Sequence, residues 1–315
     1  MNNCTKNMLD KILESCEYVS NNSKSVKINE IKLNEFARTI KKEEAKHWLM
    51  YSPYNILDLP IETIVNFLLV YEAIDFSFWG KPKWTIDTNN GKEDGGIALL
   101  YAMLKYVKDK QTTDFYNITK EEFKEILKGN VEIPLFEERY NIVWNVSDVV
   151  NKKMNGNFYM FIKDITVDTE LFDVIVNNFP DFKDERTYNN KQIYYYKLAQ
   201  LLTSDILHIR KLKENIQVDY SHLVGCSDYK IPQVMRGLGI LEYSDKLSDV
   251  IDNQKEIEVN SEYEVEIRAS MIKAIDLLKR KLKNEICAID INDYIWSQGQ
   301  NIKLKPYHLT RNTNY

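Results

Sequence analysis

The stretch NSEYEVEIRASMIKAIDLLKRKLKNE, residues 260–285, decides the fold class. Ser261 and Glu264 match the S/T-x-x-E pattern of a helix start, in which two free amide donors are satisfied reciprocally. From Val265 to Leu278 the apolar residues recur mostly at steps of three and four, and basic residues crowd the last turns. The stretch therefore predicts a long helix.

Helical periodicity continues through most of the chain. Thr119 and Glu122 repeat the capping pattern, and Gly129 then predicts the end of that helix. Alternation with a period of two is confined to 26–29 and 192–195, and the second run lies inside a helical pattern. We predict a mainly α fold, with further helices at 6–18, 33–45, 61–74, 97–109, 137–152, 170–178, 191–212 and 232–238.

Length and composition favour one helical domain over 1–315. The chain has 315 residues, of which 44% are hydrophobic, with 10 Gly and 7 Pro, and these values exclude collagen-like, low-complexity and disordered classes. We find no repeat at a fixed period and no Gly/Ser-rich or Pro-rich linker. A break near Asn189 and Asn190 is the weakest point of the single-domain prediction.

Charge and cysteine spacing restrict the partners and the compartment. The net charge of -5 gives no global cationic field for non-specific nucleic-acid binding, although a local basic patch is compatible with it. Cys4, Cys16, Cys226 and Cys287 are widely scattered, which favours a reducing compartment. No stretch of about 18 apolar residues occurs, and the first residues lack an apolar signal region. We expect a soluble, cytoplasmic protein with no membrane partner.

Metal and phosphate-loop signatures are weak. His222 and Cys226 are four residues apart and would share a helical face, but two ligands do not make a site. The stretch NNGKEDGG, 89–96, lacks the spacing of a phosphate-binding loop and is expected to be a loop before a helix. We therefore expect no metal and no cofactor.

Three clusters mix aromatic and polar residues in a way that a plain helix does not. DFSFWGKPKW at 75–84 suits either a stacking wall for a planar ligand or a helix end packed into the core. SDYKIPQV at 227–234 places Asp228 where it is either a functional carboxylate or a helix cap. DINDYIWSQGQ at 290–300 suits a pocket wall or an amphipathic terminal helix. Together they predict an aromatic-lined, acidic pocket.

Ten segments in a fixed order resemble the queuosine salvage protein family, the queuosine 5'-phosphate N-glycosylase/hydrolases. The segments are FSFWG (76–80), PKW (82–84), GGIALLYAM (95–103), IPLFEER (133–139), YYKLAQLLTSDI (195–206), SDYKIPQV, LGILEYSDKL (238–247), EVEIRASMIKAI (264–275), DYIWSQGQ (293–300) and YHLTRNTNY (307–315). Residues 1–75 match more loosely. The resemblance implies a single domain similar in fold to helical DNA glycosylases, with no metal or organic cofactor.

The activity that the resemblance implies is hydrolysis of the N-glycosidic bond of queuosine 5'-phosphate, giving queuine for tRNA modification and ribose 5-phosphate. Asp228 matches the catalytic Asp of the family's D-Y-[RK]-[VI]-P-Q motif. Its carboxylate would stabilise the positive charge that develops on the ribose and would also orient water. The 7-deazaguanine leaving group has no N7 to protonate, so electrostatic stabilisation and water positioning carry more of the catalysis.

Substrate-binding residues are expected on both sides of Asp228. The family's acidic segment, which would accept hydrogen bonds from the base and its amine arm, falls here on Asn292, Asp293 and Ser297. Two of these depart from the expected acidic residues, so Asp293 or Asp290 would replace the missing charge. Near the catalytic residue, Cys226 and Ser227 stand where family members often carry Phe. The stacking ring is then expected from Trp79, Tyr229 or Trp296.

The 5'-phosphate requires cations or amide donors. Lys197 matches a basic position of the family's [KR]-[RL]-A-Q motif and is the first choice. His47, in the loosely matched start, is either a substrate contact like the family's N-terminal His or a satisfied surface or core His. The remaining candidate cations, which on helices usually face solvent, are Lys230, Arg236, Arg268, His308 and Arg311.

Two alternative functions remain open on the sequence alone. One is an N-glycosylase for another modified purine nucleotide, prompted by the departures at Asn292, Ser297 and Cys226. The other is a non-catalytic nucleotide- or tRNA-binding module of the same fold. Asp228 and the net charge of -5 argue against the second, and a small-molecule nucleotide with no stable nucleic-acid partner is expected.

Overall fold

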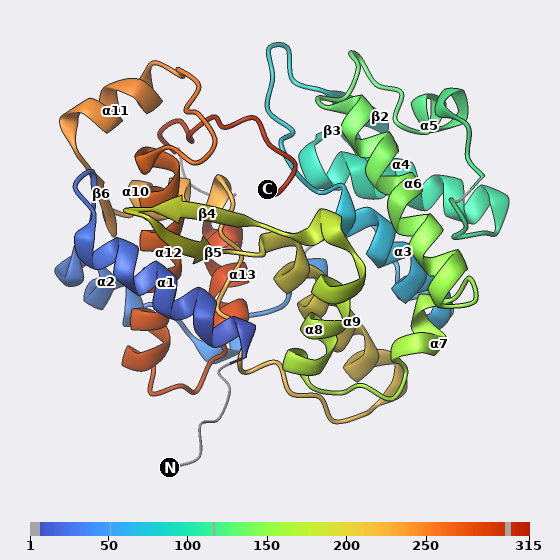
Figure 1. Ribbon diagram of the computed structural model, residues 1–315, viewed down its shortest axis with the longest axis horizontal. Coiled ribbons are helices and arrows are strands. Elements are labelled where there is room, and N and C mark those ends of the chain that lie inside the picture. Colours follow the sequence, from blue (N-terminus) through green and yellow to red (C-terminus); the bar gives the residue numbers. More distant parts are fainter. Residues whose placement is uncertain (1–6, 51, 116, 300–303) are drawn as a thin grey trace.

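The computed structural model (Figure 1) describes residues 7–50, 52–115, 117–299 and 304–315. Cys4 and the first residue of the predicted helix 6–18 lie outside the described residues. Within them the chain forms thirteen α-helices and three short two-stranded antiparallel sheets, so the mainly α prediction is confirmed. None of the described helices has both the length and the apolar character that a membrane crossing requires.

The helices account for most of the ordered chain. They are α1 (Met8–Asn22), α2 (Glu30–Ala37), α3 (Ile61–Ala73), α4 (Gly95–Lys110), α5 (Lys120–Ile126), α6 (Phe136–Lys153), α7 (Phe158–Ile162), α8 (Asp168–Asn178), α9 (Lys197–Glu214), α10 (Lys230–Gly237), α11 (Asp245–Asp252), α12 (Glu262–Lys281) and α13 (Ala288–Gly299). Three 3-10 turns are η1 (Lys42–Glu44), η2 (Trp48–Met50) and η3 (Pro180–Phe182).

The strands pair in three separate sheets. They are β1 (Val26–Ile28) with β6 (Leu241–Tyr243), β2 (Thr85–Thr88) with β3 (Gly91–Asp94), and β4 (Glu185–Tyr188) with β5 (Lys191–Tyr194). The first pair joins segments far apart in the chain, and the other two are hairpins.

The two capping predictions have different outcomes. Thr119 and Glu122 form the reciprocal box at α5. At α12, Ser261 Oγ accepts from the Glu264 N–H at 3.3 Å as predicted. The Glu264 carboxylate, however, accepts from the Asn260 N–H at 2.5 Å and from Arg186 Nε at 3.0 Å. The reciprocal half of that box is therefore wrong: the Ser261 N–H donates to the Glu258 carbonyl at 3.2 Å, and the Glu264 carboxylate accepts from Asn260 and Arg186 instead.

The first two helices and the last four lie together on one side of the molecule (Figure 1). In Figure 1, α1 and α2 lie on the left with α10 to α13, α3 to α7 lie on the right, and α8 and α9 lie between them. Helix α12 packs against α1 and α13, and α3 packs against α9 and α6. One cluster of buried apolar residues extends from Leu9 in α1 to Ile295 in α13.

Three sequence predictions of secondary structure are wrong in part. The helix expected at 33–45 ends at Ala37, because the following residues 41–46 are mostly charged and supply no apolar side to bury. The helix expected at 191–212 begins only at Lys197, after strand β5; Asn189 and Asn190 form the hairpin turn with φ of 48° and 60°. The expected loop at 89–96 contains strand β3.

Candidate active site

A pocket opens between the two sides of the molecule. Its walls come from the end of α3 and the segment after it, the β2–β3 hairpin and the start of α4, the starts of α9 and α10, α13, and the last residues of the chain. The cavity volume is about 210 Å³. Because about 10–15 Å³ of such volume holds one water, the pocket has room for an organic ligand rather than for solvent alone.

Asp228 is both a helix cap and a pocket residue. Its Oδ1 accepts hydrogen bonds from the backbone N–H groups of Lys230 and Ile231, each at 2.8 Å, at the start of α10. Among the described residues Oδ2 has no hydrogen-bond donor, and the side chain lines the pocket. Burial raises the pKa of Asp228 above its usual value, although Lys197 and the two N–H groups oppose this shift. The cap therefore fixes the carboxylate and leaves one oxygen available.

The loop before Asp228 is fixed by three helices. Gln200 on α9 donates to the Gly225 carbonyl at 3.0 Å and accepts from the Val224 N–H at 2.9 Å. Arg268 on α12 donates from Nε to the Ser227 carbonyl at 3.0 Å, and Asn292 on α13 accepts from the Cys226 N–H at 3.1 Å. This buried network places the carboxylate without help from a ligand.

Lys197 lies in the pocket but is already paired. Its Nζ donates to the Asp75 carboxylate at 2.8 Å and to the Asp75 carbonyl at 3.0 Å. Burial lowers the pKa of Lys197, but the negative charges around it, that of Asp75 first, outweigh this effect and the pKa lies above its usual value. Lys197 is thus a cation fixed among carboxylates.

Aromatic rings form much of the pocket wall. Tyr229 and Trp296, two of the expected stacking residues, line the pocket together with Phe76 and Phe78. Trp79, the third, lies outside this lining and stacks under the Arg311 guanidinium at 4.5 Å. The 75–84 cluster is therefore divided between a pocket wall and core packing.

Helix α13 contributes an amide and an acid to the pocket. Asn292 and Asp293 line it, and Asp293 Oδ2 accepts from the Trp48 N–H at 2.9 Å. Burial raises the pKa of Asp293 to about 7 against the opposing charge of His47. Asp290 lies outside the lining and pairs with His208 at 3.3 Å, so of the two suggested replacements the structure brings Asp293 to the pocket.

Three expected substrate contacts lie outside the pocket lining. His47 is buried, with Nε2 3.0 Å from Asp205 Oδ1 and its ring stacked on His208 at 4.1 Å. Ser227 Oγ donates to the Arg268 carbonyl at 3.0 Å. Ser297 Oγ donates to the Tyr294 carbonyl at 2.7 Å. Each hydroxyl or ring is turned to a protein partner, so that the core alternative holds for His47, while the partners of the two serines were not predicted.

Cys226 lines the pocket as a thiol. Burial raises its pKa well above the usual value, which favours the protonated thiol over a thiolate. His222 and Cys226 do not share a helix, because the residues between α9 and α10 form a loop.

Two further lysines, Lys230 and Lys83, line the pocket. Lys230 was among the remaining candidates expected from the sequence, whereas Lys83 was not identified. Lys230, at the start of α10, has no carboxylate partner in the described part of the chain, and its Nζ lies 4.9 Å from the centre of the Tyr307 ring. Burial and the nearby Lys83 lower the pKa of Lys230. Lys83 itself pairs with Asp94 at 3.1 Å, with both side chains about half exposed.

The other expected cations lie outside the pocket lining. Arg268 is fully buried and donates to both Asp184 oxygens, and Arg236 pairs with Asp252 at 2.6 Å. Arg311 approaches Glu256 at 3.5 Å. His308 is buried, and burial lowers its pKa to about 3, so it is neutral. The expectation that helical Lys and Arg face solvent is wrong for both buried arginines, since each neutralises a carboxylate.

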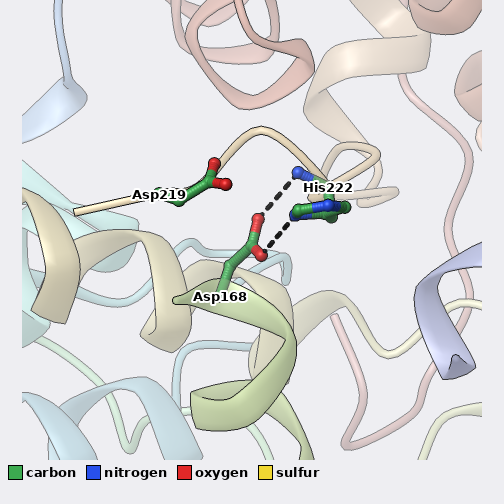
Figure 2. A group of neighbouring side chains, drawn as sticks. All are labelled: Asp168, Asp219 and His222. Carbon is green, nitrogen blue, oxygen red and sulfur yellow. Dashed lines mark hydrogen bonds and ion pairs between the residues drawn. The ribbon is translucent and has the colours of Figure 1, made fainter. Parts of the chain in front are cut away.

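A separate group of acidic and imidazole side chains has a structural explanation. Figure 2 shows His222 facing Asp168, with Asp219 to one side. Asp168 is fully buried. Its Oδ1 accepts from the Thr169 N–H and lies 2.9 Å from His222 Nδ1, and its Oδ2 accepts from the N–H groups of His222 and Leu223. The Asp219 carboxylate accepts from the Ser221 N–H. These bonds close the loop after α9 onto the start of α8.

Fold and pocket together define a mainly helical protein with an aromatic, acidic pocket of small-molecule size. The sequence model of the family described as "Queuosine salvage protein" matches residues 57–315 of this chain. The chain is 33% identical to a queuosine 5'-phosphate N-glycosylase/hydrolase of Sphaerobacter thermophilus, over 81% of this chain and 82% of that protein. A Dictyostelium discoideum protein with the same description is 27% identical over 96% and 98%, and one of Bos taurus is 26% identical over 79% and 81%. The chain belongs to the queuosine salvage protein family.

Proposed function

We propose that this protein hydrolyses the N-glycosidic bond of queuosine 5'-phosphate, releasing queuine and ribose 5-phosphate for queuine salvage. Family membership supports this activity. The observation that carries it is Asp228, whose Oδ1 is held by two amides while Oδ2 is left without a donor among the described residues. A carboxylate fixed in this way stabilises positive charge on a ribose that becomes oxocarbenium-like.

The reaction places three demands on the pocket. Aromatic rings such as Tyr229 and Trp296 provide faces for the planar base. Asp293 and Asn292 offer oxygens to its N–H donors, and ionised Asp293 attracts the cationic amine arm. As the C–N bond breaks and its electron pair leaves with the base, water bound to Asp228 Oδ2 attacks the anomeric carbon and gives one proton to the carboxylate. Asp228 then passes this proton to N9 of the departing base, so that neutral queuine is released and the carboxylate is restored.

For the 5'-phosphate we propose Lys230 and Lys83 as the main ligands. Lys230 is a partly buried ammonium without a carboxylate partner in the part of the chain that the structure describes, and the nearby Lys83 adds a second positive charge. Two neighbouring ammonium groups favour an anion between them. Lys197 remains a second candidate, and its positive charge, which lowers the pKa of Asp228, also favours the ionised form of that carboxyl.

Single alanine variants separate these roles. Lys230→Ala and Lys83→Ala are expected to raise KM for queuosine 5'-phosphate, each about tenfold, and to leave KM for queuosine nearly unchanged, because one charge-assisted bond contributes about 1.5–3 kcal/mol at most. Lys92→Ala, on strand β3 with an exposed side chain 3.9 Å from Asp87, is the matched control. Equal effects on nucleotide and nucleoside would move the phosphate site away from these lysines.

The activity itself is tested by product release. Purified protein is incubated with queuosine 5'-phosphate, with queuosine and with GMP, and free queuine and guanine are followed by chromatography. We expect queuine release that is fastest from the 5'-phosphate. Faster release of guanine would indicate a broader N-glycosylase, and saturable binding without release of either base would indicate a binding module.

Three wider expectations belong to the same proposal. A fold similar to helical DNA glycosylases agrees with the mainly helical chain. A reducing, cytoplasmic location agrees with the free thiols of Cys16, Cys226 and Cys287. A free nucleotide rather than tRNA is the proposed substrate, and intact queuosine-containing tRNA added at equal concentration should neither be cleaved nor inhibit.

A further inference from the structure

Two buried carboxyl groups, Glu72 and Asp205, lie within interaction distance of each other in the core. Glu72 on α3 and Asp205 on α9 are both fully buried, and these two helices pack together. Neither oxygen of Glu72 has a donor among the described residues, and neither has Asp205 Oδ2. Three buried carboxylate oxygens without a donor are very unfavourable if both groups are ionised. A proton between the two groups removes that difficulty.

We propose that Glu72 and Asp205 share one proton, with Glu72 as the neutral acid that donates to Asp205 Oδ2, and that this pair positions the wall of the pocket. Electrostatics agree with the assignment. Burial, then the charges of Asp205 and Asp75, raise the pKa of Glu72 well above its usual range, and Lys197 only partly opposes them.

With the shared proton on Glu72, Asp205 keeps one negative charge, and its other oxygen, Oδ1, has two hydrogen-bond partners. Oδ1 lies 3.0 Å from His47 Nε2 and accepts from Trp48 Nε1 at 2.9 Å. Burial lowers the pKa of His47, but its hydrogen bond with Asp205 outweighs that effect, together with the charges of Asp205, Asp293 and Asp290. Asp205 therefore binds the imidazole of His47 and the indole of Trp48 at once.

A chain of contacts connects this pair to the pocket. Trp48 lines the pocket and donates its backbone N–H to Asp293 Oδ2. Glu72 thus acts on the substrate through Asp205, Trp48 and Asp293. The other titratable groups around the pair are Tyr71 and Asp75 near the end of α3, Lys197 on α9, Cys226 in the loop before α10, and His208 with Asp290 beyond His47.

The first test needs neither substrate nor a variant. Infrared spectra of the protein in D₂O, with glutamate carboxyls labelled with ¹³C, report whether a buried Glu is protonated at pH 8. We expect the carbonyl band of a protonated Glu carboxyl, and we expect it to be absent from Glu72→Gln. Absence of the band from the wild-type protein at pH 8 overturns the shared proton.

The second test rests on the proposed function. Glu72→Gln keeps a neutral donor toward Asp205, whereas Glu72→Ala leaves Asp205 Oδ2 without one. We expect Glu72→Ala to raise KM for queuosine 5'-phosphate about tenfold, the usual cost of one unsatisfied buried group, and Glu72→Gln to restore most of it. Equal loss in both variants overturns the positioning role. A protein that shows the infrared band but releases no queuine would instead contradict the proposed activity alone.

Discussion

At the scale of single residues, Asp228 combines two tasks that are usually treated as alternatives. As a cap it satisfies two free amides of α10, and as a pocket residue it keeps one oxygen without a donor among the described residues. The sequence allowed both interpretations and did not choose between them. The structure unites them, because a side chain with two oxygens bonds the helix with one and leaves the other available.

Asp228→Asn separates the cap from the charge. An Asn oxygen still accepts from the amides of Lys230 and Ile231, so the free energy of unfolding should change by less than about 0.5 kcal/mol, while turnover should fall at least about a hundredfold. Ser244→Ala, which removes the cap of α11, is the control and should cost about 1 kcal/mol without affecting turnover. Thermal denaturation and queuine release measure the two effects. An active Asp228→Asn variant would remove this carboxylate from the mechanism.

The pH dependence of activity should follow Asp293 and Asp228. Both carboxyls have raised pKa values and are needed as carboxylates, so kcat/KM should fall as the pH decreases, with an inflection near 7 from Asp293. In Asp293→Asn the inflection near 7 should disappear, and the acid limb due to Asp228 should remain. An unchanged profile would contradict the assignment.

The raised pKa of Asp293 also affects the pH dependence of the free energy of unfolding. Asp293 binds its proton more tightly when folded, at a pKa of about 7, than when unfolded, at about 3.9. Its contribution is therefore fully present at low pH and is lost as the pH rises through about 7. Urea denaturation between pH 5 and 8 should show a flatter dependence for Asp293→Asn than for the wild-type protein. A steeper dependence in the variant would contradict this sign.

The pocket residues that the sequence revealed are those with a distinctive neighbourhood. Asp228, Tyr229, Asn292 and Asp293 stand in short segments rich in aromatic and polar residues, and all four line the pocket. Lys83 and Asp75 were missed although they lie within or beside quoted segments, because an ordinary lysine or aspartate shows its orientation only in three dimensions. His47 was found, but its burial against Asp205 depends on a contact 158 residues away in the chain.

At the scale of elements, periodicity predicted the long helices, and its two short alternating runs at 26–29 and 192–195 coincide with β1 and β5. Helices such as α3, α6 and α12 repeat their apolar pattern over several turns. The hairpins have strands of four residues each, and their turns use Asn–Asn pairs. Strands this short are hard to tell from the start of a helix, and the alternation at 192–195 lies inside a helical pattern. The start of α9 was misplaced for this reason, because strand β5 carries residues that also suit a helix.

The loop between α9 and α10 is the element on which Asp228 depends. Gly225 has φ of +115°, and a Cβ there would lie 2.9 Å from Ile275 Cδ1. Gly225→Ala should destabilise the protein by about 1–3 kcal/mol or more and lower turnover by displacing Asp228. Gly91→Ala, at φ of +109° with open space around it, is the matched control and should cost strain alone. Equal losses of turnover in the two variants would show that the loop does not position the catalytic residue.

At the scale of the whole molecule, the pocket joins segments from both sides of the fold. Tyr71 and Asp75 come from one side, Asp228 and Asp293 from the other, and Lys197 from the helix between them. This arrangement was beyond sequence reasoning, because periodicity places residues on a helix face and does not say which helices meet. A ligand held by both sides should stabilise the entire chain.

Substrate should therefore raise the unfolding temperature, and the protein should still unfold in a single transition. With the Asp228→Asn variant, which does not consume its ligand, queuosine 5'-phosphate at a hundred times its Kd adds about 2.7 kcal/mol, or several degrees. Differential scanning calorimetry should show a single transition without ligand, as one domain over 1–315 requires, and the same single transition shifted upward with it. Two separate transitions would contradict the single domain.

The most direct test of the central claim compares wild-type protein with Asp228→Asn in a single turnover. Enzyme in excess is mixed with queuosine 5'-phosphate, the reaction is quenched at intervals, and queuine and ribose 5-phosphate are quantified together. The account predicts equal amounts of both products from the wild-type protein, and from the variant a rate at least about a hundredfold lower with binding retained. No queuine from the wild-type protein, or equal rates from both proteins, would contradict it.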